Sequence, residues 1–135
     1  MSESSFAITT EVDQDFEQVL PRAVAALKAQ GFGVLTEVDV RATMQAKLGV
    51  DFRRYMILGV CNPPLAHQAL SADLSVGLML PCTVVVYDNG DGSSTVSALN
   101  AQTAIGIVGN PQLADVAATV TNLLSTAIAS LNQTA

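Results

Sequence analysis

Five segments of this chain have the hydrophobic patterning of β-strands. They are residues 5–12, 31–40, 53–61, 82–88 and 95–102. In the first segment, Phe6, Ile8 and Thr10 occupy alternate positions, so we expect their side chains to share one face of the strand. The segment 53–61 is apolar at both alternations, which is typical of a strand covered on both faces. We therefore expect it to be central in a sheet and covered at least partly by a partner chain.

The first predicted helix follows directly after the first strand. It begins near Asp13, an acidic residue suited to the positive end of a helix, and it ends at Gly31. Pro21 lacks a backbone N–H donor, so we expect either a kink there or a late helix start near Leu20. Apolar side chains recur at helical spacing and would form its buried face: Phe16, Leu20, Ala23 and Leu27.

Three further segments have helical patterning. Residues 40–49 predict a short helix that ends at Gly49. Asn62 is followed by two prolines, and this favours a helix start because Asn caps well and Pro suits the first turn. The last helix runs from about Pro111 to Leu131. Its continuous apolar stripe consists of Leu113, Val116, Ala117, Val120, Leu123, Leu124, Ala127, Ile128 and Leu131.

These elements predict an α+β fold, an α/β two-layer sandwich. We expect about five mainly antiparallel or mixed strands with three to four helices packed on the sheet. The turn at residues 88–94 (DNGDGSS) joins the last two strands as a hairpin, because Asn-Gly and Asp-Gly favour tight turns. With 135 residues, the chain is expected to form a single domain over residues 1–135.

Composition narrows the classes of partner. Half of the residues are hydrophobic and only 13% are charged, which suggests that some surface is covered by another chain. The net charge is −6, and all six basic residues lie between Arg22 and Arg54. Nucleic acid is therefore an unsuitable partner, because phosphate binding requires clustered Lys and Arg.

The chain is expected to be cytoplasmic. Its N-terminus has neither the basic region nor the apolar region of a secretory signal, and no apolar run approaches the length of a membrane helix. We expect no membrane association. In the cytoplasm the two cysteines, Cys61 and Cys82, would be reduced thiols and would not form a disulfide.

Several short motifs, spread over nearly the whole chain, resemble the bacterial and archaeal family known as domain of unknown function 302. The motifs are Gly31-Phe32, Leu48-Gly49-Val50-Asp51-Phe52, Tyr55, Cys61-Asn62-Pro63, Ala66, Ala69-Leu70 and Leu80-Pro81-Cys82. The most specific part of the resemblance is the spaced pair of Cys-Asn-Pro and Leu-Pro-Cys.

The resemblance implies a small α/β domain with helices packed on one sheet, commonly a homodimer. It implies no established function, although some members of the family look associated with sulfur or redox genes. One position departs from the pattern. This chain has Asn100-Ala101 where the family tends to have Asp-Pro, which puts any role of that aspartate in doubt here.

The corner formed by Cys61, Asn62 and Cys82 is the first candidate site. A thiolate at Cys61 would lie beside the N-terminus of the helix that follows, where the free amides lower a cysteine pKa, although the two prolines there offer none. If the strands that end and begin at these cysteines are neighbours, the two sulfurs could hold a soft ion such as Cu(I) or Zn(II). The alternative is that both cysteines pack as small hydrophobic residues. The spacing of Cys61 and Cys82 matches no established metal motif, so no metal and no cofactor are assigned.

His67 is the only histidine in the chain and lies one turn into the helix that starts after Asn62. Its imidazole could reach the Cys61 region as a third metal ligand, or as the base of a Cys/His pair in a hydrolase that lacks an orienting acid. The alternative is a solvated polar side chain. His67 is not part of the motifs that carry the resemblance.

Charged residues also cluster ahead of the central strand. Arg53, together with Lys47 and Arg54, could bind an anion through the guanidinium groups. The alternative is that Asp51 pairs with Arg53 or Arg54 and fixes this loop.

The polar face of the last helix is almost uncharged, which suits either a subunit interface or plain surface. It carries Thr119, Asn122, Ser125, Thr126 and Ser130.

The sequence therefore predicts a homodimeric binding module without an assignable reaction or catalytic residue. Its site, for a small ligand or a soft metal, would lie near Cys61, Asn62 and Cys82. The competing interpretation is a soft-metal carrier, sulfur carrier or redox protein that uses the two thiols.

Overall fold

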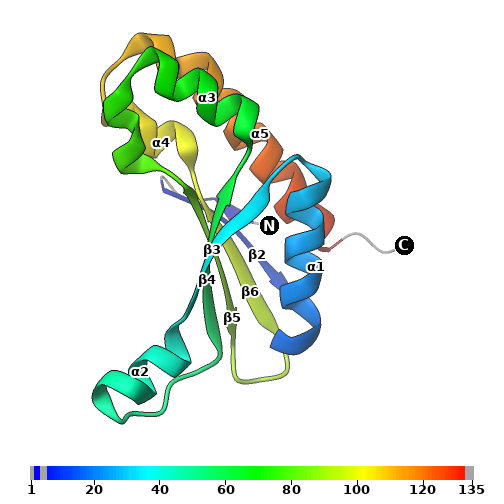
Figure 1. Cartoon of the computed structure of the whole chain (residues 1–135). Helices are drawn as coiled ribbons and strands as arrows, with labels where there is room; N and C mark the ends of the chain where they lie inside the picture. Colours follow the sequence, from blue (N-terminus) through cyan, green and yellow to red (C-terminus); the bar gives the residue numbers. More distant parts are fainter. Residues whose placement is uncertain (1, 4–5, 133–135) are drawn as a thin grey trace.

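The computed structural model describes residues 2–3 and 6–132, which form one antiparallel sheet with helices packed against it (Figure 1). The strands are β1 (Ser2–Glu3), β2 (Ala7–Val12), β3 (Gly33–Asp39), β4 (Tyr55–Cys61), β5 (Cys82–Asp88) and β6 (Ser94–Leu99). The α-helices are α1 (Phe16–Ala29), α2 (Val40–Leu48), α3 (Pro63–Ala72), α4 (Ala101–Gly106) and α5 (Ala114–Ser130). Two 3₁₀ helices are η1 (Leu74–Met79) and η2 (Pro111–Leu113).

The strands lie in the order β1-β2-β6-β5-β4-β3, and each neighbouring pair is antiparallel. The predicted α+β fold with helices on one sheet is confirmed. Strand β4 is an inner strand between β5 and β3, as its apolar pattern predicted. The prediction for Phe6 is wrong. Pairing of β2 begins at Ala7, so Phe6 lies beyond the strand and its side chain is 63% exposed, whereas Ile8 and Thr10 are buried.

Helix α1 begins at Phe16, and the late start near Leu20 is wrong. The Asp15 carboxylate accepts the N–H of Gln18 at 3.0 Å, which caps the helix four residues earlier than that prediction. Pro21 is tolerated inside the helix, where its side chain is exposed. The helix ends as predicted at Gly31, whose φ of 89° is the left-handed conformation that glycine adopts without strain.

Helix α2 matches its prediction but has no buried residue. The Asp39 side chain caps its start by accepting the N–H of Ala42, and Gly49 ends it with a φ of 65°. Figure 1 shows α2 beyond the end of the sheet, away from the other helices. Its apolar side chain Leu48 is 68% exposed, and Val50 and Phe52 directly after it are 44% and 42% exposed.

Helix α4 is absent from the sequence prediction. The strand expected over residues 95–102 ends at Leu99, because Asn100 turns the chain and caps a new helix. The Asn100 side chain accepts the N–H of Thr103 at 3.2 Å. An Asn at an N-cap starts a helix and thereby ends the element before it, which is why the strand stops at Leu99.

One face of the sheet forms the hydrophobic core with α1 and α5, which Figure 1 shows on the same side of the sheet. The stripe predicted for the last helix is largely buried there, with Leu124, Ala127 and Ile128 each at most 1% exposed. In the described part of the chain, Pro111–Ser130 is the one helical stretch long and apolar enough to cross a membrane, with 20 residues and a mean hydropathy of 1.3. The expectation that no segment reaches this length is therefore wrong, although core helices of soluble proteins have the same composition.

Candidate functional site

The predicted corner lies at one end of the sheet, where two strands and one helix meet. Cys61 is the last residue of β4 and Cys82 is the first residue of β5. In the register of these strands Cys82 lies opposite Val60, the residue before Cys61. The expectation that the two strands are neighbours is thus confirmed, and it places the two cysteines at the same end of the sheet.

Asn62 connects this corner to the first helix. Its Oδ1 accepts the N–H of Leu65 at 3.5 Å, which caps α3 as predicted, and its Nδ2 donates to the carbonyl of Gln30 at 3.4 Å. Gly31 lies so near that a Cβ atom there would be 2.8 Å from Nδ2 of Asn62. Both ends of the Asn62 amide are therefore engaged in holding α3 against the end of α1.

A narrow apolar pocket borders both cysteines under α3. Its free volume is about 30 Å³, which is close to the space of one water molecule. The residues around it are Phe32, Val60, Cys61, Asn62, Leu65, Ala66, Ala69, Leu80, Pro81, Cys82, Ile105, Val116 and Val120. A site of this size holds one small atom or group unless α3 moves.

Cys82 is a neutral thiol at physiological pH. Burial raises its pKa from 9.0 to about 11, and the proximity of Cys61 adds to the rise. The Cys82 side chain also packs against the hydrophobic core. These surroundings are those of a packing cysteine, since reactive cysteines lie in environments that stabilise the thiolate.

The strand register offsets the two cysteines by one residue, because Cys82 pairs with Val60 and not with Cys61. Both cysteines nevertheless border the same pocket, and Cys61 is near enough to raise the pKa of Cys82. Of the two, only Cys82 packs against the hydrophobic core. Both thiols are unpaired and partly exposed.

Of the roles considered for His67, which include a third ligand and a solvated side chain, its position agrees with the latter. His67 is exposed on α3. Within residues 2–3 and 6–132, no group of three or more His, Cys, Asp or Glu side chains is placed to hold a metal ion. The three-ligand arrangement of Cys61, Cys82 and His67 is therefore not assembled in this structure.

The pairing expected for Asp51 in the loop before β4 is wrong. Arg54 instead forms an ion pair with Glu17 of α1, and its guanidinium lies 4.7 Å from the centre of the Phe16 ring. Arg53 donates to the carbonyl of Asp88 at 3.1 Å, across the end of β5. Both arginines thus fix the loop to neighbouring elements, although Arg53 remains exposed.

A second and larger hollow lies at the start of α5, and the sequence reasoning did not find it. This open groove of about 530 Å³ has no charged side chain in its wall. It is formed by Gln102, Ile105, Gly106, Gly109, Asn110, Pro111, Leu113, Ala114 and Ala117. Gln102 in its wall lies in the segment 95–102 that was predicted as a strand, and the structure places it in α4.

The comparisons with known proteins agree with the fold and the motifs. The family model described as domain of unknown function DUF302 matches residues 8–131. A solved structure, an uncharacterised conserved DUF302 protein from Bacillus stearothermophilus, is 32% identical in sequence. The similarity covers 93% of this chain and 98% of that one, with a TM-score of 0.85. No curated protein is significantly similar to this chain.

The one departure from the expected family pattern has a structural account in this chain. Asn100 supplies the cap of α4, and aspartate caps a helix equally well, so the substitution keeps this role. The family motifs at Cys61-Asn62-Pro63 and Leu80-Pro81-Cys82 meet at one corner of the sheet. From the family match over residues 8–131 and the shared fold, the chain belongs to the DUF302 family.

Proposed function

We propose that this protein is a cytoplasmic, homodimeric binding module that acts by holding a small ligand near Cys61, Asn62 and Cys82. The observation that carries the proposal is the chemistry of the pocket at this corner. Its wall is apolar, Asn62 is engaged in capping, and Cys82 is a neutral thiol whose pKa is raised by burial. Such a wall favours retention of an apolar group over acid–base or nucleophilic chemistry.

Two further features support the location and the assembly. Both cysteines are unpaired, which suits a reducing compartment. Apolar side chains remain exposed outside the core, among them Leu35 at 65% and Phe52 at 42%, and a second chain would cover such residues.

The second candidate is a thiol-based carrier or redox protein that uses Cys61 and Cys82. It is favoured by one observation, that both cysteines border the same pocket. Its weakness is the neutral thiol of Cys82, since a soft metal or an oxidant reacts with thiolates.

Alkylation of the native protein separates the two candidates. Iodoacetamide is added between pH 6 and pH 9, and modified cysteines are counted by mass spectrometry with Cys61→Ser and Cys82→Ser as matched variants. The binding proposal expects Cys82 to react only after unfolding and no Cu or Zn to co-purify in stoichiometric amount. A cysteine that titrates near neutral pH, or one equivalent of metal lost in Cys82→Ser, would establish the thiol function instead.

A further inference from the structure

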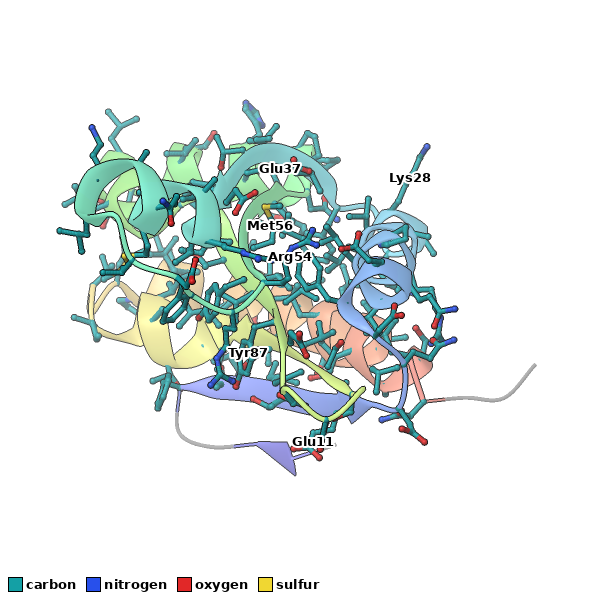
Figure 2. The ribbon with its side chains drawn as sticks, turned by 90° about the horizontal axis from the view of Figure 1, so that it is seen from below. Glu11, Lys28, Glu37, Arg54, Met56 and Tyr87 are labelled. Atoms are coloured by element: carbon teal, nitrogen blue, oxygen red, sulfur yellow. The ribbon has the colours of Figure 1, made fainter. Side chains whose placement is uncertain are left out.

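Among residues 2–3 and 6–132, no helix packs along the sheet face opposite the core. Strand register identifies its side chains, because paired residues share a face and neighbours along a strand alternate. They are Ala7, Thr9 and Glu11 of β2, Thr95, Ser97 and Leu99 of β6, Thr83, Val85 and Tyr87 of β5, Tyr55, Ile57 and Gly59 of β4, and Thr36 and Val38 of β3. Figure 2 shows Tyr87 on the side of the sheet away from α1 and α5. We call this surface the open face.

The centre of the open face is aromatic and aliphatic. The Tyr55 and Tyr87 rings are stacked, with centroids 5.1 Å apart and planes 5° from parallel, and Phe52 lies 6.3 Å from Tyr55. Ile57 and Val85 pair directly beside them. Near the opposite edge of the sheet, Phe6 borders a shallow hollow of about 400 Å³ on this face. Such a set of side chains is typical of an interface centre.

Charge identifies the kind of partner that suits this face. Among its side chains only Glu11 is charged, although the chain has 12 acidic and six basic residues and a net charge of −6. Nucleic acid and strongly charged proteins would find no charge of opposite sign there. Two copies of this chain repel each other over most of their surface, but they can meet on an uncharged face without opposing like charges.

The available area also suits a second copy. Five strands of six or seven residues, about 4.8 Å apart and about 3.4 Å long per residue, cover roughly 500 Å². A standard interface buries about 800 Å² on each partner. Further exposed apolar side chains on β3 and after α2 can enlarge this area: Leu35, Leu48, Val50 and Phe52.

The face is uncovered, almost uncharged and large enough to form much of an interface. We infer that a second copy of this chain docks on the open face, with α2 and residues 48–52 reaching over the partner. This inference rests on the proposed homodimer and specifies its surface. It assigns to a second copy the cover over the other face of β4, since the hydrophobic core includes Leu58 and Val60 of this strand but not Ile57. It also assigns a role to α2, which contributes no buried residue to its own chain.

The test is the mass of the full chain in solution, measured by light scattering at 5–100 µM. Val85→Lys and, at a milder position, Ser97→Lys place a charge on the open face. Thr119→Lys is the matched control, because Thr119 lies on the exposed polar face of α5. Circular dichroism and thermal unfolding establish that each variant is folded. We expect a dimer for the wild type and Thr119→Lys, and a dissociation constant raised at least tenfold in both open-face variants.

The measured masses separate two claims, that the protein is a homodimer and that the open face is its interface. A monomeric wild type at 100 µM would refute the homodimer and this inference together. A dimer that persists in folded Val85→Lys and Ser97→Lys would refute the surface assignment alone. Loss of the dimer only in Thr119→Lys would place the interface on α5.

Discussion

At the residue scale, the position of each candidate side chain could be predicted from the sequence, but its burial and its partners could not. The sequence located Asn62 as a cap and Cys61 and Cys82 at strand ends, because capping and strand patterning are local signals. It could not determine that burial raises the pKa of Cys82, since burial depends on how α5 and α3 pack over the strand end. The partner of Arg54 was missed for the same reason, because Glu17 lies 37 residues away.

The raised pKa of Cys82 makes stability depend on alkaline pH. The unfolded thiol ionises near its ordinary pKa of 9.0, whereas the folded thiol ionises near 11. Between these values the unfolded state loses the proton first, so the free energy of unfolding falls as pH rises, by about 2–3 kcal/mol at most. Urea unfolding at pH 8, 9, 10 and 11 measures this loss. Cys82→Ala should show a smaller decline, and identical declines in the two proteins would contradict the shift.

At the element scale, caps and glycines explain most helix boundaries. Asp15, Asp39, Asn62 and Asn100 each cap the start of a helix. Of these caps, Asn62 was identified from the sequence, whereas the first helix was predicted to start near Asp13 or late near Leu20 and no cap was predicted for the second. The fourth was missed because Asn100 directly follows a strand and the helix after it is only six residues long. The order of strands was not predicted, since pairing between distant segments leaves no local pattern.

The two roles of Asn62 can be separated by substitution. Asn62→Ala removes both the cap of α3 and the bond to Gln30, and it should lower the free energy of unfolding by about 1–2 kcal/mol. Asn62→Asp keeps the capping acceptor and loses only the donor to Gln30. Chemical denaturation should therefore rank the stabilities as wild type, Asp variant, Ala variant. Equal losses in the two variants would mean that the cap contributes nothing.

Gly59 is required by close packing within the sheet. A Cβ at this position would be 2.8 Å from Cγ of Pro81 and nearer still to Oγ1 of Thr36. Gly59→Ala should therefore destabilise the protein by about 1–3 kcal/mol through overpacking. Gly33 is the matched control, because a Cβ there meets no atom within 4 Å. A thermal denaturation series in which Gly33→Ala loses as much as Gly59→Ala would rule out this explanation.

At the scale of the whole molecule, more hydrophobic side chains are present than the core takes in, and Leu48, Leu74 and Leu78 are among those left exposed. The sequence indicated this excess through its low charge and through the two-sided apolar pattern of β4. It could not identify which face stays uncovered, because that depends on α1 and α5 packing on the same side of the sheet (Figure 1).

The charge of the whole chain makes a proposed dimer sensitive to salt. Each copy has a net charge of −6, so association opposes a repulsion that added ions screen. Raising NaCl from 0.05 M to 0.5 M should lower the dissociation constant, by roughly threefold to tenfold. Sedimentation equilibrium over this range measures the change. Weaker association at high salt would indicate that ion pairs between the copies hold the interface, against the uncharged open face.

The position of α5 in the chain has a consequence for synthesis. This helix provides a large share of the core, yet it follows all the strands that it covers. While a ribosome is still making α5, the helices α1, α3 and α4 are complete, but the buried stripe of α5 is missing from the core. The nascent chain therefore exposes apolar residues of its strands until α5 emerges, and such exposed surface makes a folding intermediate prone to aggregation.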